Sequence, residues 1–337
     1  MGSGFASNVS FIYFNLIKSL HFTEITKVSN YYPPFFHLSS TPLYFLFGFS
    51  EDIAIFTNLI YYFILIYAVF RTAEILKDKK AGIISAAVIS VFPMVIKLQR
   101  VYMLDFAFTA LIALTILLYL KSEDFKSLKY SVFFGIVFGL AELTKWNTFI
   151  YILPSVFTLF LVNYFTRCPY CYRIVESGQI KGYRKFCSKQ HLKLYEKSVK
   201  TNRLLNFAIS IFLAFLFAAW WYLPNLNTVV TRLIYFANIG GREGDPTFLT
   251  LQGWIYYSNS ILDSTGAVFL IVFVISMYCI YRYNRYLFFG LSTPIALVYI
   301  ILTMLSNKDP RYIMPIYITI YCDFGRNFRK HFGKSKI

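Results

Sequence analysis

Four potential metal ligands lie within a short stretch of the chain. Cys168 and Cys171 are separated by two residues, fifteen residues follow, and Cys187 and His191 are then separated by three. Three thiolates and one imidazole complete a tetrahedral shell around Zn²⁺ and leave no position for a reactive water. The spacing therefore predicts a structural zinc site.

Ionisable residues gather at three other places, each where an apolar run ends: 97–105, 142–145 and 308–312. Charges at membrane depth are costly and often functional, although any single one can simply end a helix. If the three junctions lie on one side of a membrane, they can border one cavity. Their charged members are Lys97, Arg100, Asp105, Glu142, Lys145, Lys308, Asp309 and Arg311.

The composition shows what must position these groups. Of the 337 residues, 57% are hydrophobic and only 15% are charged, and the mean hydropathy is +0.55. Soluble domains carry about 25% charged residues. The chain is therefore expected to be an all-α membrane protein, a polytopic helical bundle with a small zinc-binding insert.

Apolar runs bounded by charge predict about nine membrane spans. Several are shorter than the roughly 20 residues of a full span, and Pro315 interrupts the last. The spans are 52–70, 82–96, 103–120, 130–144, 147–164, 204–222, 264–281, 287–304 and 312–322.

The basic residues orient these spans. One alternating set of loops holds 24 of the 33 Lys and Arg, which the positive-inside rule assigns to the cytoplasm. This bias explains the net charge of +17 without nucleic acid. It places the three charged junctions outside and the C-terminus inside. An external N-terminus without a signal peptide suggests one further span upstream. The cytoplasmic loops are 71–81, 121–129, 165–203, 282–286 and 323–337.

Four regions follow from this topology. An external segment with interfacial helices (1–51) precedes the first part of the bundle (52–165), and Phe11 and Phe14 mark one such helix. The Cys₃His insert (166–203) is cytoplasmic. The second part of the bundle (204–337) ends in a basic cytoplasmic tail. Its external loop (223–263) is glycine-rich and charged, and is either a mobile lid or a plain solvated turn.

Six short motifs give the chain a resemblance to a known family. The types and the order of these motifs resemble those of the polytopic C-type glycosyltransferases, and most closely those of the protein O-mannosyltransferases and lipid A aminoarabinose transferases. The resemblance covers roughly 30–322, apart from the insert. The motifs are Tyr32-Pro33-Pro34, Leu46-Phe47-Gly48, Arg100 to Asp105, Gly139 to Lys145, Trp221-Tyr222 and Asp309-Pro310-Arg311-Tyr312.

The resemblance implies a membrane-bound active site on the external face. Members take a sugar from a polyprenyl-phosphate carrier and pass it to a protein, lipid or glycan. Such a displacement needs a carboxylate at the acceptor hydroxyl and cations at the leaving phosphate. Asp105 is the candidate carboxylate, either orienting Arg100 or binding a divalent metal. The candidate substrate-binding residues are Arg100, Lys145, Lys308, Arg311, Tyr32 and His37.

The chain departs from the family at one decisive position. The family carries an acidic residue some 25–30 residues before the Pro-Pro element, but positions 3–8 hold no carboxylate, and the nearest is Glu24. Either the chain is a fragment, or it is a catalytically inactive relative that binds lipid-linked sugars or acts as a scaffold. A lipid transporter is a third interpretation, but no internal repeat supports it.

The insert itself resembles small zinc ribbons with a Phe186-Cys187-Ser188 knuckle. In a reducing cytosol, zinc is favoured over a disulfide. Ten basic residues in 165–203 suit contact with anionic lipid headgroups. Recruitment of a cytosolic partner or nucleic acid is the less favoured alternative.

Overall fold

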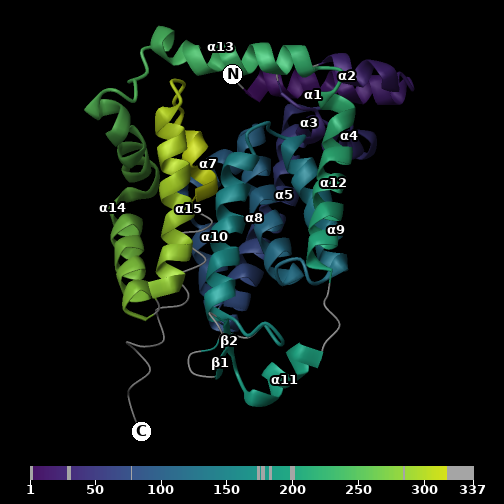
Figure 1. Cartoon of the computed structure of the whole chain (residues 1–337). Coiled ribbons are helices and arrows are strands. Elements are labelled where there is room, and N and C mark those ends of the chain that lie inside the picture. Colours follow the sequence, from purple (N-terminus) through teal and green to yellow (C-terminus); the bar gives the residue numbers. More distant parts are fainter. Residues whose placement is uncertain are drawn as a thin grey trace.

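The computed structural model describes residues 3–28, 32–76, 78–172, 175, 179–181, 184–197, 202–283 and 285–316. Most of these residues are helical, and the helices lie side by side in one bundle (Figure 1). Within the described part, strands occur only in an antiparallel hairpin, β1 (Gln179–Lys181) with β2 (Arg184–Phe186). The expected all-α membrane fold is confirmed.

The bundle helices coincide with the expected apolar spans. By length and composition, α5, α8, α10 and α12 can each cross a membrane, and the bent pair α6 and α7 makes a fifth candidate. The last expected span begins as the 3₁₀ helix η2 (Pro310–Ile313), and 317–337, with the basic tail, lie outside the described residues. The bundle helices are α5 (Glu51–Leu76), α6 (Lys79–Ser90), α7 (Pro93–Gln99), α8 (Leu104–Ser122), α9 (Leu128–Glu142), α10 (Phe149–Thr166), α12 (Arg203–Tyr222), α14 (Leu251–Tyr283) and α15 (Arg285–Met304).

The expected span 82–96 is broken in the structure. The axes of α6 and α7 differ by 59°. The break has a local cause, because Pro93 is the first residue of α7 and has no N–H to continue α6. The bend sets the direction in which the chain enters α8.

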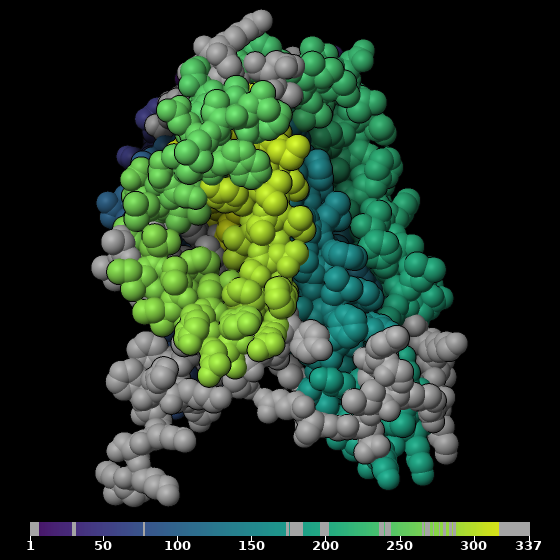
Figure 2. All heavy atoms as spheres, turned by 60° about the vertical axis from the view of Figure 1, so that its left-hand side comes forward, coloured from purple at the N-terminus to yellow at the C-terminus, as the bar shows by residue number. Residues whose placement is uncertain are grey.

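Helix α8 is the centre of the bundle, and nearly all of its residues are buried. It packs against α5 and α9, and α9 in turn packs closely against α12. A Cβ atom on Gly135 would lie only 2.2 Å from the carbonyl oxygen of Ser210, so glycine is required for this approach. Figure 2 shows the opposite flank, where α14 (green) stands beside α15 (yellow).

Short elements cover the two ends of the bundle (Figure 1). Helices α1 and α13 lie across one end, and the hairpin and α11 lie at the other. Phe14 of α1, which was expected on the apolar face of an interfacial helix, is buried in the protein core. These elements are α1 (Ser3–Lys18), η1 (Phe22–Glu24), α2 (Ile25–Val28), α3 (Phe35–Leu38), α4 (Thr41–Phe47), α11 (Lys189–Lys197) and α13 (Leu226–Glu243).

The glycine-rich segment expected as an external loop is largely helical. Helix α13 occupies its first half, and α14 begins at Leu251. Val230, Leu233 and Ile234 recur at helical spacing and give the segment an apolar stripe. This periodicity outweighs the glycines, and α13 ends before Gly244, whose φ of 82° suits glycine.

Candidate functional site

The three charged junctions meet at the end of the bundle that carries α1 and α13. Lys145, after α9, lies 2.6 Å from Asp105 Oδ1 through its Nζ atom. Arg311, in η2, lies 3.5 Å from Asp105 Oδ2 through Nη1. The side chains of Asp105 and Lys145 are only 7% and 6% exposed. One buried carboxylate therefore links two cations that are far apart in the sequence.

A second carboxylate, Asp309, fixes the guanidinium of Arg311. Nε of Arg311 lies 2.9 Å from both carboxylate oxygens, and Nη2 also donates to Oδ2. Asp309 Oδ1 accepts a further bond from the backbone N–H of Arg311 at 2.8 Å. Burial alone raises the pKa of Asp309, but the hydrogen bonds and charge of Arg311, with the charge of Lys145, hold it below its ordinary value.

Asp309 is one of the charged residues at the three junctions, but its sequence context alone gave it no role in the site. The signal was present, because an Asp before a Pro at the first helical position is a typical N-cap. An N-cap of this kind places the carboxylate beside the first turn, which here contains Arg311.

Aromatic rings complete the surroundings of Lys145. Its ammonium lies 4.4 Å from the ring centroid of Tyr312 and 5.5 Å from that of Phe108. Tyr151, on α10, donates its hydroxyl to the carbonyl of Tyr312 at 2.8 Å. Because two rings and a carboxylate hold the charge from several sides, the position of Lys145 is fixed by the protein itself.

Lys308 is used differently from the expectation. Its Nζ donates to the carbonyls of Thr303 and Leu305, both at 2.7 Å, and so caps the end of α15. Its backbone N–H donates to Asp245 at 2.8 Å. Burial lowers the pKa of Lys308, although Asp245 opposes this shift. Two of its three donors therefore serve the fold, as expected of a cation at a helix C-terminus.

Arg100 stands apart from the ion pairs. It follows α7 and is exposed, and its side chain makes no hydrogen bond or ion pair with any residue that the structure describes. Asp105, one of whose expected roles was to orient Arg100, pairs with Lys145 and Arg311 instead of Arg100. The guanidinium of Arg100 is consequently available for an anionic ligand.

The expected substrate contacts Tyr32 and His37 differ in burial. Tyr32 is partly buried against the core. His37 is buried among Tyr13, Phe36 and Tyr102, and its Nδ1 atom has no hydrogen-bond partner. Burial lowers the pKa of His37 to about 4. The aromatic neighbours make His37 a neutral core residue in this arrangement, beside the site rather than facing it.

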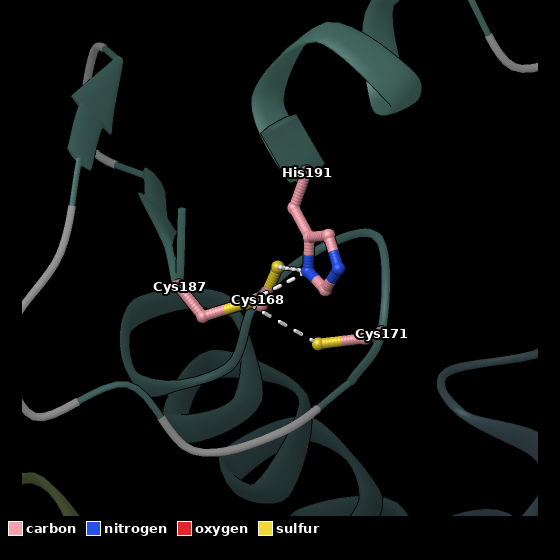
Figure 3. Close-up of side chains that lie close together, drawn as sticks. All are labelled: Cys168, Cys171, Cys187 and His191. Carbon is pink, nitrogen blue, oxygen red and sulfur yellow. Dashed lines mark hydrogen bonds between the residues drawn. The ribbon is translucent and has the colours of Figure 1, made fainter. Parts of the chain in front are cut away.

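The four expected metal ligands converge at the other end of the bundle (Figure 3). Their ligand atoms all lie within 4.8 Å of one another. Cys171 and Cys187 have their sulfur atoms 3.5 Å apart, too far for a disulfide of about 2.05 Å. Zn–S bonds of about 2.3 Å in a tetrahedron imply sulfur atoms about 3.7 Å apart. The four residues, Cys168, Cys171, Cys187 and His191, can therefore hold a metal ion.

The four ligands come from three local elements. Cys168 and Cys171 lie in a tight turn after α10, closed by a 2.8 Å bond from Tyr172 N–H to the carbonyl of Cys168. Cys187 follows β2. His191 lies in the first turn of α11, where Ser188 Oγ accepts its backbone N–H at 3.1 Å. Cys187 Sγ and His191 Nδ1 lie 2.7 Å apart, so the cluster is already compact.

Comparisons with known proteins agree with this architecture. Residues 32–173 match the family described as dolichyl-phosphate-mannose-protein mannosyltransferase. No curated protein sequence matches the chain significantly.

Solved structures share the fold at low sequence identity. ArnT from Cupriavidus metallidurans in the apo state has a TM-score of 0.63 and 14% identity, over 98% of this chain and 55% of ArnT. ArnT bound to undecaprenyl phosphate gives 0.60 and 13%, over 88% and 50%. The Archaeoglobus fulgidus oligosaccharyltransferase, tethered to an acceptor peptide, gives 0.51 and 14%, over 88% and 41%. The chain spans about half the length of these proteins.

The buried ion pair predicts strong coupling between its partners. Asp105→Asn or Lys145→Met alone leaves an uncompensated buried charge and should lower the free energy of unfolding by about 3 kcal/mol or more. The double variant should lose much less than the sum of the two, measured by unfolding in detergent. The exposed pair Lys27–Glu24 is the control, and its removal should cost less than about 1 kcal/mol. Additive losses at Asp105 and Lys145 would contradict the pairing.

The buried imidazole predicts acid sensitivity. His37 titrates near pH 4 in the folded protein and near 6.5 when unfolded, so the unfolded state binds more protons between these values. Stability should therefore fall as the pH drops through this window, by up to about 3 kcal/mol. His37→Phe should remove this part of the pH dependence, whereas substitution of the exposed His21 should not. Identical profiles for wild type and His37→Phe would show that His37 is not buried.

Proposed function

We propose that this chain, a multi-pass membrane protein with the C-type glycosyltransferase fold, transfers a sugar from a polyprenyl-phosphate donor to an acceptor. The acceptor is a protein, lipid or glycan. The observation that carries the proposal is the cluster of buried Asp105 and Lys145 with partly exposed Asp309 and Arg311, built from three separate junctions at one end of the bundle.

The charge balance of the cluster assigns different roles to its members. Two carboxylates and two cations cancel, so the cluster holds its own shape before any substrate binds. Asp105 and Asp309 position the cations, and Lys145 and the unpaired Arg100 bind the phosphate. Cations at this place stabilise the charge that develops when the anomeric carbon–oxygen bond breaks. Asp105 is also the candidate for the carboxylate that takes the acceptor proton.

An apolar pocket next to the cluster suits the lipid part of the donor. It is a narrow, open hollow between α8, α10 and α15, with Ile112, Ile116 and Val298 in its wall. Tyr151 lines the same pocket and bonds to Tyr312, whose ring covers Lys145. The phosphate would thus meet Lys145 while the first isoprene units lie against α10 and α15. One structure with this fold, ArnT, is described as bound to undecaprenyl phosphate.

Charge distribution supports an external active site in the cell membrane. The cluster and the basic insert lie at opposite ends of the bundle (Figure 1). Basic segments remain in the cytoplasm under the positive-inside rule, so the insert is cytoplasmic and the cluster external.

Transfer can be measured directly in nanodiscs with polyprenyl-phosphate-linked radioactive hexoses and pentoses. Arg100→Ala should lower the rate at least about 100-fold, the usual effect of losing a group that stabilises transition-state charge. The matched control is Arg71→Ala, on α5, whose partly exposed side chain pairs with Glu74 on the same helix. Its rate should stay near that of the wild type.

The same experiment separates the enzyme from an inactive relative. Binding of undecaprenyl phosphate without any transfer would favour a protein that only binds lipid-linked sugars. The absence of a carboxylate at positions 3–8 is the observation behind that alternative. If the chain neither binds undecaprenyl phosphate nor transfers a sugar, the proposed function is wrong.

We further propose that Cys168, Cys171, Cys187 and His191 bind Zn²⁺ as a structural site. Its three thiolates and one imidazole fill a tetrahedral shell.

Metal analysis of the purified chain should give one zinc per molecule. Cys187→Ser should lose it, while the exposed Lys189→Ala should keep it. Because the site lies far from Asp105, Cys187→Ser should retain part of the transferase activity, and complete loss in a well-folded variant would contradict this separation.

A further inference from the structure

Asp124 is a buried carboxylate that neither proposed site uses. It lies in the turn between α8 and α9 and is 6% exposed. Its Oδ1 atom accepts three hydrogen bonds, from the hydroxyl of Tyr119 at 2.6 Å, the amide of Asn163 at 2.9 Å and the hydroxyl of Tyr172 at 2.9 Å. These donors come from α8, α10 and the turn that carries the first two cysteines. Asp124 thus joins the membrane bundle to that turn.

Two basic residues hold the same turn from its other side. Arg167 precedes Cys168, and it donates from Nε to Asn163 Oδ1 at 2.8 Å and from Nη1 to the carbonyl of Tyr172 at 2.9 Å. Its guanidinium lies 4.7 Å from the ring centroid of Tyr172. Lys126 donates to the carbonyl of Pro169, between the two cysteines. The carboxylate of Asp124 balances these buried charges.

The backbone is unusual at both contact surfaces. Glu123, Asp124 and Phe125 have φ values of 54°, 59° and 62°, and Tyr172 has 59°. Non-glycine residues rarely adopt this region, and they do so only where the surroundings over-determine it. Asn206 on α12 adds such a constraint, because its amide donates to the carbonyls of Phe125 and Lys126 at 2.9 and 3.1 Å.

We propose that Asp124 is a positioning residue for the metal site, and that it locks the Cys168–Tyr172 turn onto the bundle. The inference rests on the proposed metal site. Asp124 holds the turn through Tyr172, and the metal holds it through Cys168 and Cys171. Each therefore orders the segment that the other needs, so the coupling must be reciprocal: the carboxylate raises metal affinity, and bound metal stabilises the α8–α9 turn.

The test compares zinc affinities of the full chain in detergent, by competition with a chromophoric chelator. Asp124→Asn keeps the shape but removes the charge, and it should weaken zinc binding at least about tenfold, the lower range for a group that supports metal ligands indirectly. Glu123→Gln is the matched control in the same turn, where the side chain is 44% exposed and 3.8 Å from Lys126. It should bind within about twofold of wild type.

A second readout tests the reciprocal effect. Removing zinc from the wild type should speed amide hydrogen exchange at 119–126, and should change it little in Asp124→Asn. If Asp124→Asn does not fold, Tyr172→Phe removes only the hydroxyl that reaches Asp124 and should weaken zinc binding in the same direction.

Three results would overturn the proposal. Zinc binding by Asp124→Asn as tight as in the wild type would show that the carboxylate does not position the turn. Unchanged amide hydrogen exchange at 119–126 after zinc is removed from the wild type would show that bound metal does not stabilise the α8–α9 turn. If the wild type binds no zinc, the proposed metal site itself is wrong. This outcome is distinguishable from failure of the Asp124 proposal, because it concerns the wild type and not the difference between variants.

Discussion

The ion pairs of the buried Asp105 carboxylate are the interactions on which the rest of the candidate site depends. Asp105 stands at the start of the central helix α8 and reaches Lys145 after α9 and Arg311 in η2. A carboxylate without partners would be very costly at 7% exposure, so the chain must bring both junctions to it. The Pro93 bend before α8 and the Asp309 cap before Arg311 are the local devices that make this meeting possible.

The two ends of the bundle solve different problems. At one end, Asp105 pairs with Lys145 and Arg311 within the protein, while the side chain of Arg100 stays exposed, which suits an anionic substrate that arrives and leaves. At the other end, three cysteines and a histidine can hold a metal ion, and Asp124 bonds to the turn that carries two of them. The charged cluster and the candidate metal site are thus separated by the length of the bundle.

The sequence predicted most of the architecture, because apolar runs and helix-ending charges are local signals. It predicted the metal cluster for the same reason, since the four ligands lie within one short segment. It did not predict which cation pairs with which carboxylate, because these contacts depend on helix directions across the whole chain. Lys308 was expected to bind substrate but caps α15, and His37 was expected in the site but is enclosed by aromatic rings. Helix α13 was not predicted, because its glycines are typical of loops and were given more weight than its apolar stripe.

The most direct test of the account is a structure of the chain with undecaprenyl phosphate in a nanodisc. The account predicts the phosphate within hydrogen-bonding distance of Lys145 or Arg100, with the isoprene chain along the pocket between α10 and α15. Lys145 and Arg311 should remain on the Asp105 carboxylate. A phosphate bound at the opposite end of the bundle, beside the metal cluster, would contradict it.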